Sequence, residues 1–90
     1  MDKTFELQIL TPRKRVFSGQ VTSLVAPGEM GYLGILSNHA PLVTTLAPGK
    51  VTFRDPAGST RVLQSLGDGL LEVQKNQAVL LLDDVKEGAV

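Results

Sequence analysis

The close spacing of glycine and proline constrains this chain most, because these residues interrupt it repeatedly from Pro12 to Gly69. Proline inside a helix removes a hydrogen bond and clashes with the preceding turn, and glycine weakens a helix. No segment carries an apolar stripe of helical period that is long enough to cover a core. The short apolar runs between the interruptions alternate with polar residues instead. The sequence therefore predicts an all-β fold, an antiparallel sandwich or small barrel of roughly eight or more short strands.

The first expected strand shows the alternation most clearly. Phe5, Leu7 and Ile9 share one face, and Glu6 and Gln8 share the other, which is the pattern of a strand with one buried face. Similar segments, read as further strands, lie at residues 21–26, 50–55, 60–64, 70–74 and 78–83.

The segments between these strands carry turn residues. Pro-Gly at 27–28 and Asp-Pro-Ala-Gly at 55–58 predict turns. The three consecutive leucines at 80–82 indicate a strand that is covered on both faces. Residues 85–90 are expected to fray, because they follow the last expected strand.

Length and charge limit the kinds of protein that this chain can be. Ninety residues correspond to one domain, expected at residues 1–85 with a short tail at 86–90. Nine basic and nine acidic side chains balance, so no overall field attracts nucleic acid. The basic residues at 13–15 lack interleaved aromatic side chains and indicate a solvated turn. The longest apolar run, at 78–82, is far shorter than the ~20 residues of a membrane helix, so we expect membrane contact only through a partner.

The residues show no arrangement that could perform catalysis. His39 is the only histidine, and no strained nucleophile turn accompanies it, as a Ser-His-Asp site requires. Gly28, Gly31 and Gly34 match neither the dinucleotide fingerprint nor the phosphate-binding loop. The acidic pair at 83–84 is expected to be solvated. We therefore expect no catalytic residue, no metal and no cofactor, and a function that depends on a binding surface.

The stretch from Gly31 to Gly49 is the most constrained part of the chain. Two glycines and two prolines restrict its backbone, and we expect its apolar residues at 33, 35, 36, 42, 43 and 46 to be buried. The stretch resembles the epsilon subunit of bacterial and chloroplast F-type ATP synthases. That family carries a Gly-x-Leu-Gly-Ile run, then His-Ala-Pro-Leu and Pro-Gly, found here as Gly31, Leu33, Gly34, Ile35, His39, Ala40, Pro41, Leu42, Pro48 and Gly49.

The resemblance covers roughly residues 4–85, because shorter motifs outside the stretch also fit the family pattern. It implies a flattened antiparallel β-sandwich of about ten strands. It also implies a non-catalytic rotor subunit in the central stalk of a proton-translocating F-type ATP synthase. Such a subunit binds the gamma subunit and the ring of c subunits and couples ring rotation to ATP synthesis. Its expected location is peripheral, at the cytoplasmic face of the inner (plasma) membrane.

The resemblance also implies where the partners bind. It places the c ring at the first turn of the stretch and the gamma subunit at the histidine and proline that follow. The implied c-ring residues are Glu29, Met30, Gly31, Tyr32 and Leu33. The implied gamma-subunit residues are His39, Ala40, Pro41, Leu42 and Val43.

Two departures from the family pattern affect these expectations. Tyr32 occupies a position where many relatives have an acidic or small polar residue, so a c-ring contact here would use different chemistry. Many relatives continue into a two-helix hairpin, and this chain of 90 residues stops before it, so we expect no helical inhibitory arm in it. Two other classes stay open. A generic sandwich that binds a ligand or peptide needs an exposed aromatic platform, and a small hydrolase needs a nucleophile arrangement.

Overall fold

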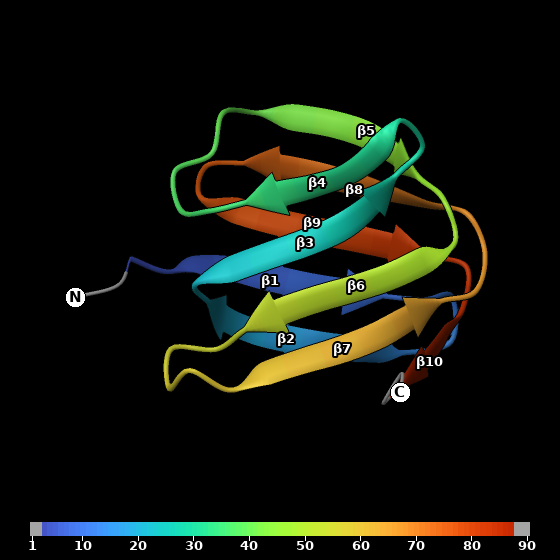
Figure 1. Cartoon of the computed structure of the whole chain (residues 1–90), viewed down its shortest axis with the longest axis horizontal. Coiled ribbons are helices and arrows are strands. Elements are labelled where there is room, and N and C mark those ends of the chain that lie inside the picture. The colour runs from blue at the N-terminus through green and yellow to red at the C-terminus, as the bar shows by residue number, and fades with distance from the viewer. Residues whose placement is uncertain (1–2, 88–90) are drawn as a thin grey trace.

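The computed structural model describes residues 3–87, and within them the chain forms ten β-strands and no helix (Figure 1). This confirms the predicted all-β class. No helix in this part of the chain is therefore available to cross a membrane. The strands are β1 Phe5–Leu10, β2 Arg15–Val21, β3 Ser23–Gly28, β4 Gly31–Ile35, β5 Leu42–Leu46, β6 Gly49–Arg54, β7 Thr60–Ser65, β8 Gly69–Gln74, β9 Gln77–Leu82 and β10 Val85–Glu87.

The strands form one hydrogen-bonded sheet that curls into two layers. The order is β10-β7-β6-β3-β5-β8-β9-β1-β2, and β4 pairs with β3 beside this path. Strands β4, β3, β6, β7 and β10 form the layer nearest the viewer, and the other five lie behind them (Figure 1). A single residue pair, Gly28 with Leu46, joins the layers at one corner. All strand pairs are antiparallel except the parallel pair of β1 and β9.

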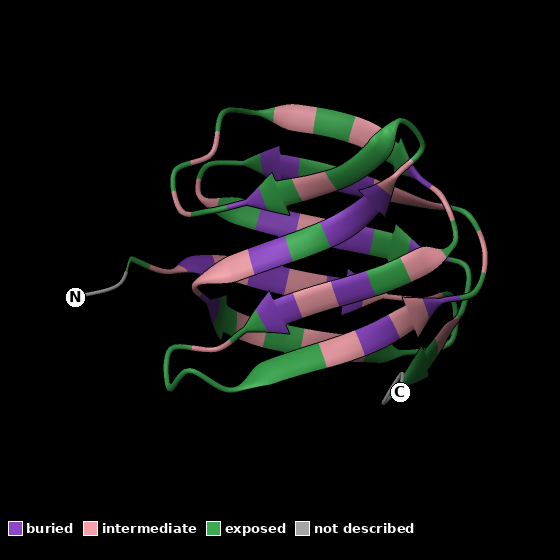
Figure 2. Cartoon of the chain, in the orientation of Figure 1, coloured by how far each residue is buried: buried purple, intermediate pink, exposed green. Residues whose placement is uncertain are grey.

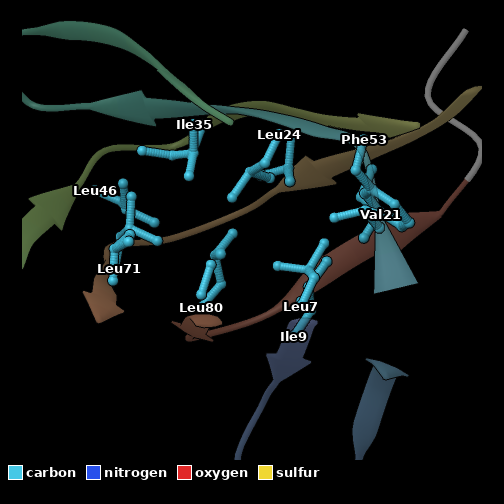
Figure 3. Close-up of a cluster of buried hydrophobic side chains, with 14 of the residues drawn as sticks. Leu7, Ile9, Val21, Leu24, Ile35, Leu46, Phe53, Leu71 and Leu80 are labelled. Atoms are coloured by element: carbon cyan, nitrogen blue, oxygen red, sulfur yellow. The ribbon is translucent and has the colours of Figure 1, made fainter. Parts of the chain in front are cut away.

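The core lies between the layers and consists of aliphatic and phenylalanine side chains (Figure 3). In β1 every second residue is buried, as the alternation predicts, and the same stripes cross the neighbouring strands (Figure 2). Burying each leucine or valine contributes about 1.5–3 kcal/mol. The fully buried members include Leu7, Ile9, Val21, Leu24, Ile35, Leu46, Val51, Phe53, Leu63, Leu71 and Leu80.

The segment 21–26 is not one continuous strand, as we expected it to be. Val21 ends β2 in the rear layer, and the chain bends at Thr22 into β3 of the front layer. Both layers bury their inner faces, so the alternation of buried and exposed residues starts anew at the bend. Val21 and Leu24 are therefore both buried, although their spacing of three residues places them on opposite faces of a single strand.

The turn predicted at Pro27–Gly28 lies two residues further along the chain. Both residues belong to β3, and the chain reverses at Glu29 and Met30. Gly31 follows with a φ of 131°, which a glycine adopts at no steric cost. The hairpin of β3 and β4 therefore ends in a two-residue tip.

The central stretch buries fewer apolar residues than we expected. Ile35 and Leu46 lie in the core, and Leu33 and Leu42 are half-buried against it. Leu36 and Val43 are each 64% exposed, so the prediction of burial is wrong at these two positions. The chain leaves β4 after Ile35, and Val43 lies on the outer face of β5.

The prediction of a strand covered on both faces at residues 80–82 is also wrong. Leu80 and Leu82 are buried, whereas Leu81 is 46% exposed. β9 lies between β8 and β1 inside the rear layer. The other layer covers its inner face, and nothing within residues 3–87 covers its outer face.

The residues after Asp84 form a strand where we expected fraying. Val85–Glu87 is β10, which pairs antiparallel with β7 from Ser65 to Leu63. Val85 is half-buried against the core, and the burial of this apolar side chain stabilises the pairing. Fraying is therefore the wrong prediction for residues 85–87, and residues 88–90 lie outside the described part of the chain.

The turn predicted at residues 55–58 is confirmed. The Gly58 amide donates to the Asp55 carbonyl at 3.0 Å, and the Ser59 amide donates to the Asp55 carboxylate at 3.0 Å. Gly58 has a φ of 92°, which favours glycine. The predicted hairpin of β6 and β7 follows from this turn.

The edge of the sandwich opposite the Gly28–Leu46 corner is closed by side chains. The Arg61 guanidinium lies 5.4 Å from the ring centres of both Phe17 and Phe53. The Glu87 carboxylate accepts a hydrogen bond from Arg61 at 3.1 Å and lies 3.8 Å from the Lys14 ammonium. Phe17 belongs to β2 of the rear layer, Lys14 to the turn before it and Arg61 to the front layer, so this cluster ties the two layers together.

Candidate binding surfaces

The surroundings of His39 are those of a loop residue. Its ring Nδ1 lies 2.7 Å from the carbonyl oxygen of the next residue, Ala40. No hydroxyl or carboxylate of residues 3–87 makes a hydrogen bond with the ring. No three His, Asp or Glu side chains in the described chain gather as metal ligands.

The two sets of residues singled out from the sequence lie at opposite ends of β4. The hairpin tip of Glu29 and Met30 precedes β4, and the loop at residues 36–41 follows it (Figure 1). A strand of five residues spans about 17 Å. The structure therefore separates the expected c-ring set from the expected gamma-subunit set and does not merge them into one patch.

The hairpin tip presents its residues to solvent. Met30 is fully exposed and Glu29 is exposed beside it. Leu33, the last residue of the expected c-ring set, instead points inward and packs against the core. The exposed members of the set, which a partner could contact here, are therefore Glu29, Met30, Gly31 and Tyr32.

Tyr32 is fixed on the outer face of the front layer. Its hydroxyl accepts a hydrogen bond from the Lys50 amide at 3.0 Å, although 59% of the residue is exposed. A methyl group at Gly49 would lie 2.9 Å from this hydroxyl and 2.8 Å from the Pro27 side chain. Gly49 is thus needed for the close approach of the tyrosine hydroxyl to the backbone of β6.

The expected gamma-subunit set has both inward and outward members. Leu42 pairs with the buried Val73 and is itself half-buried. Ala40 and Pro41 are exposed, and Val43 is 64% exposed on the outer face of the rear layer. Val43 is therefore the member of the set on β5 that a partner could contact, beside the exposed Thr45 of the same strand.

The outer face of the rear layer carries apolar side chains that our sequence reasoning missed. Leu81 of β9 stands opposite Leu70 of β8 and opposite Leu10 of β1, and we name these three residues the outer leucine row. A pocket of about 350 Å³ lies at one end of the row, lined by Leu10, Thr11, Pro12, Leu81 and Leu82. The alternation in β1 and β9 could have revealed the row. Leu10 and Leu81 are leucines at positions that alternate with the buried residues of their strands, so both lie on the outer face.

The fold defines a class of protein, a small two-layer β-sandwich with exposed apolar side chains on its outer faces. The family model of the ATP synthase delta/epsilon chain β-sandwich domain matches residues 4–88. The chain belongs to this family, so the resemblance read from its central stretch is confirmed.

Individual relatives support the same family. The chain is 44% identical over 89 residues to the ATP synthase epsilon chain of Dichelobacter nodosus, a match that covers 99% of this chain and 62% of that protein. It is 46% identical over 84 residues to the epsilon chain of Chlorobium limicola, a match that covers 93% of this chain and 94% of that protein. The chain thus spans less than two thirds of the first relative and nearly all of the second.

Solved structures share the fold. A chain of the Euglena gracilis mitochondrial ATP synthase, in a structure of its OSCP/F1/c-ring, superposes with a TM-score of 0.87 at 16% identity. The match covers 93% of this chain and 53% of that one. A chain of the Tetrahymena thermophila mitochondrial ATP synthase, in a structure of its central stalk and c ring, gives a TM-score of 0.78 at 17% identity. That match covers 96% of this chain and 68% of the other.

Proposed function

We propose that this chain is a non-catalytic rotor subunit in the central stalk of a proton-translocating F-type ATP synthase. It binds the gamma subunit and the c ring and couples ring rotation to ATP synthesis. Membership of the delta/epsilon β-sandwich family over residues 4–88 carries this proposal. The chain is peripheral, at the cytoplasmic face of the inner (plasma) membrane, and touches the membrane only through the complex.

The gamma subunit binds across the outer face of the rear layer in this proposal. The outer leucine row supplies an apolar centre, which is the usual composition of the buried part of an interface. Val43 adds an apolar side chain beside it, opposite the exposed Glu72. The exposed Ala40 and Pro41 extend this surface toward the loop before β5. Leu42 supports the surface from within, because its side chain packs against the core.

The c ring contacts the hairpin tip. Met30 offers a flexible apolar side chain and Glu29 a carboxylate, so the tip can meet both apolar and basic groups. Tyr32 adds a phenol whose hydroxyl is already occupied by the Lys50 amide. Because the hydroxyl only accepts in that bond, Tyr32 can contribute packing and one donated hydrogen bond, and the charge at this contact comes from Glu29.

Two variants, each with one added charge, test the two contacts separately. The 90-residue chain should bind the isolated gamma subunit, and Leu81→Glu should weaken that binding at least tenfold, because a charge enters an apolar contact. Met30→Glu should leave gamma binding unchanged and weaken binding to detergent-solubilised c ring. Thr60→Glu, on an exposed residue of β7 away from both surfaces, should change neither. Unchanged gamma binding by a folded Leu81→Glu would contradict the gamma surface, and a chain that binds neither partner would contradict the proposed function.

A further inference from the structure

Asn76 holds together three segments that are far apart in the sequence. It lies in the turn between β8 and β9 with a φ of 59°, a left-handed conformation that asparagine tolerates. Its side-chain oxygen accepts a hydrogen bond from the Asn38 amide at 2.7 Å, and its side-chain nitrogen donates to the Thr4 carbonyl at 2.9 Å. Its own carbonyl accepts a hydrogen bond from the Glu6 amide at 3.2 Å.

The bond to Asn38 is the anchor of the loop at residues 36–41. Within residues 3–87 it is the only hydrogen bond that joins this loop to another segment, since the His39 ring contacts only its neighbour. Asn38 itself has a φ of 62°, so the chain bends sharply where it is held. The turn, the loop and the start of the described chain all lie at the same end of the sandwich (Figure 1).

We propose that Asn76 is a positioning residue that sets the loop at 36–41 for binding the gamma subunit. This inference rests on the proposed function. A loop that is already held in its bound position loses less conformational freedom on binding. Asn76 combines a residue type suited to the left-handed turn with a side chain that reaches the loop, and glycine at this position would keep only the first property.

The neighbouring Lys75 offers a matched control. It has a similar φ of 50° in the same turn, and its exposed side chain makes no hydrogen bond or salt bridge within the described chain. Lys75→Gly therefore changes the turn backbone as Asn76→Gly does, but removes no contact with the loop. Asn76→Asp keeps an oxygen for the Asn38 amide and loses the donor to Thr4, which separates the two ends of the side chain.

The test measures three quantities on the 90-residue chain and these variants: gamma-subunit affinity, amide exchange at Asn38 and the unfolding midpoint. Asn76→Gly should raise the gamma-subunit Kd about five- to thirtyfold and speed exchange at Asn38 at least tenfold. Asn76→Asp should lower the midpoint by as much as Asn76→Gly, yet keep the Kd within about twofold of the unchanged chain. Lys75→Gly should change neither the Kd nor the exchange at Asn38.

Other results would overturn the inference. If affinity follows the unfolding midpoint across all three variants, Asn76 has only a structural role. If exchange at Asn38 is unaltered in Asn76→Gly, the anchor does not hold the loop. If the unchanged chain does not bind the gamma subunit, the proposed function fails and the role of Asn76 in that binding fails with it. The exchange experiment still reports on the anchor in the free protein, so the two failures can be told apart.

Discussion

Replacing each of two adjacent leucines of β9 by alanine should affect stability and partner binding to very different extents. Leu80 is fully buried between the layers, opposite the buried Leu71 and Ile9, whereas Leu81 is 46% exposed in the outer leucine row. The two substitutions remove the same atoms from neighbouring positions of one strand. Differences in strand propensity therefore cancel, and the difference in burial remains.

The magnitudes follow from the burial of each side chain. Leu80→Ala loses the transfer free energy of a buried side chain and leaves a cavity, a cost of about 3 kcal/mol. Leu81→Ala loses about half of the transfer term and leaves no cavity, a cost of at most about 1 kcal/mol. A domain of this size has a free energy of unfolding of about 5–10 kcal/mol, so the first variant loses about 30–60% of it.

Urea denaturation measures these losses. With a slope of about 1.3 kcal/mol per molar urea, the unfolding midpoint should fall by about 2.3 M for Leu80→Ala and by at most about 0.8 M for Leu81→Ala. Gamma-subunit affinity should show the reverse order, because only Leu81 lies on the proposed contact. Equal shifts of the two midpoints would refute the one-sided burial of β9, and equal affinities would refute the gamma surface.

Three further predictions concern packing outside the core. Gly49→Ala should lower the free energy of unfolding by about 1–3 kcal/mol, because the new methyl group would crowd the Tyr32 hydroxyl; Tyr32→Phe in the same chain should recover part of this loss, measured by a double-mutant cycle in urea. Arg61→Ala should cost more than Glu87→Gln, because it removes the packing on two phenyl rings as well as an exposed ion pair worth at most about 1 kcal/mol. The Glu87→Gln loss should shrink in 1 M NaCl, and a loss that salt leaves unchanged would contradict an ionic role.

Local patterns were sufficient to predict the strands and most of the turns. The alternation in β1 and the Asp-Pro-Ala-Gly turn at residues 55–58 depend on neighbours in the chain, and the structure has both. Alternation divides a strand into two faces, but it does not say whether one or both are covered. That depends on which layer the strand joins, which is why the exposure of Leu81 and Val43 could not be predicted.

The candidate surfaces were harder to predict than the fold. The sequence located the tip and the loop only through resemblance to a family, and the structure sorted each set into inward and outward residues. Leu33 and Leu42 face the core because they alternate with Tyr32 and Val43 along their strands. The Asn76 anchor joins residues 38 positions apart, and no local pattern encodes such a contact.

The corner between the layers links the two proposed surfaces mechanically. At the base of the hairpin tip the Glu29 amide donates to the Thr45 carbonyl at 3.4 Å, and the Ala47 amide donates to the Pro27 carbonyl at 2.8 Å. These bonds attach β3 directly to the end of β5, the strand that carries Val43. The tip is therefore connected to the rear layer by backbone hydrogen bonds and not only by flexible side chains. The proposed function requires such a joint, because a subunit between the c ring and the gamma subunit has to move as one rigid body with both.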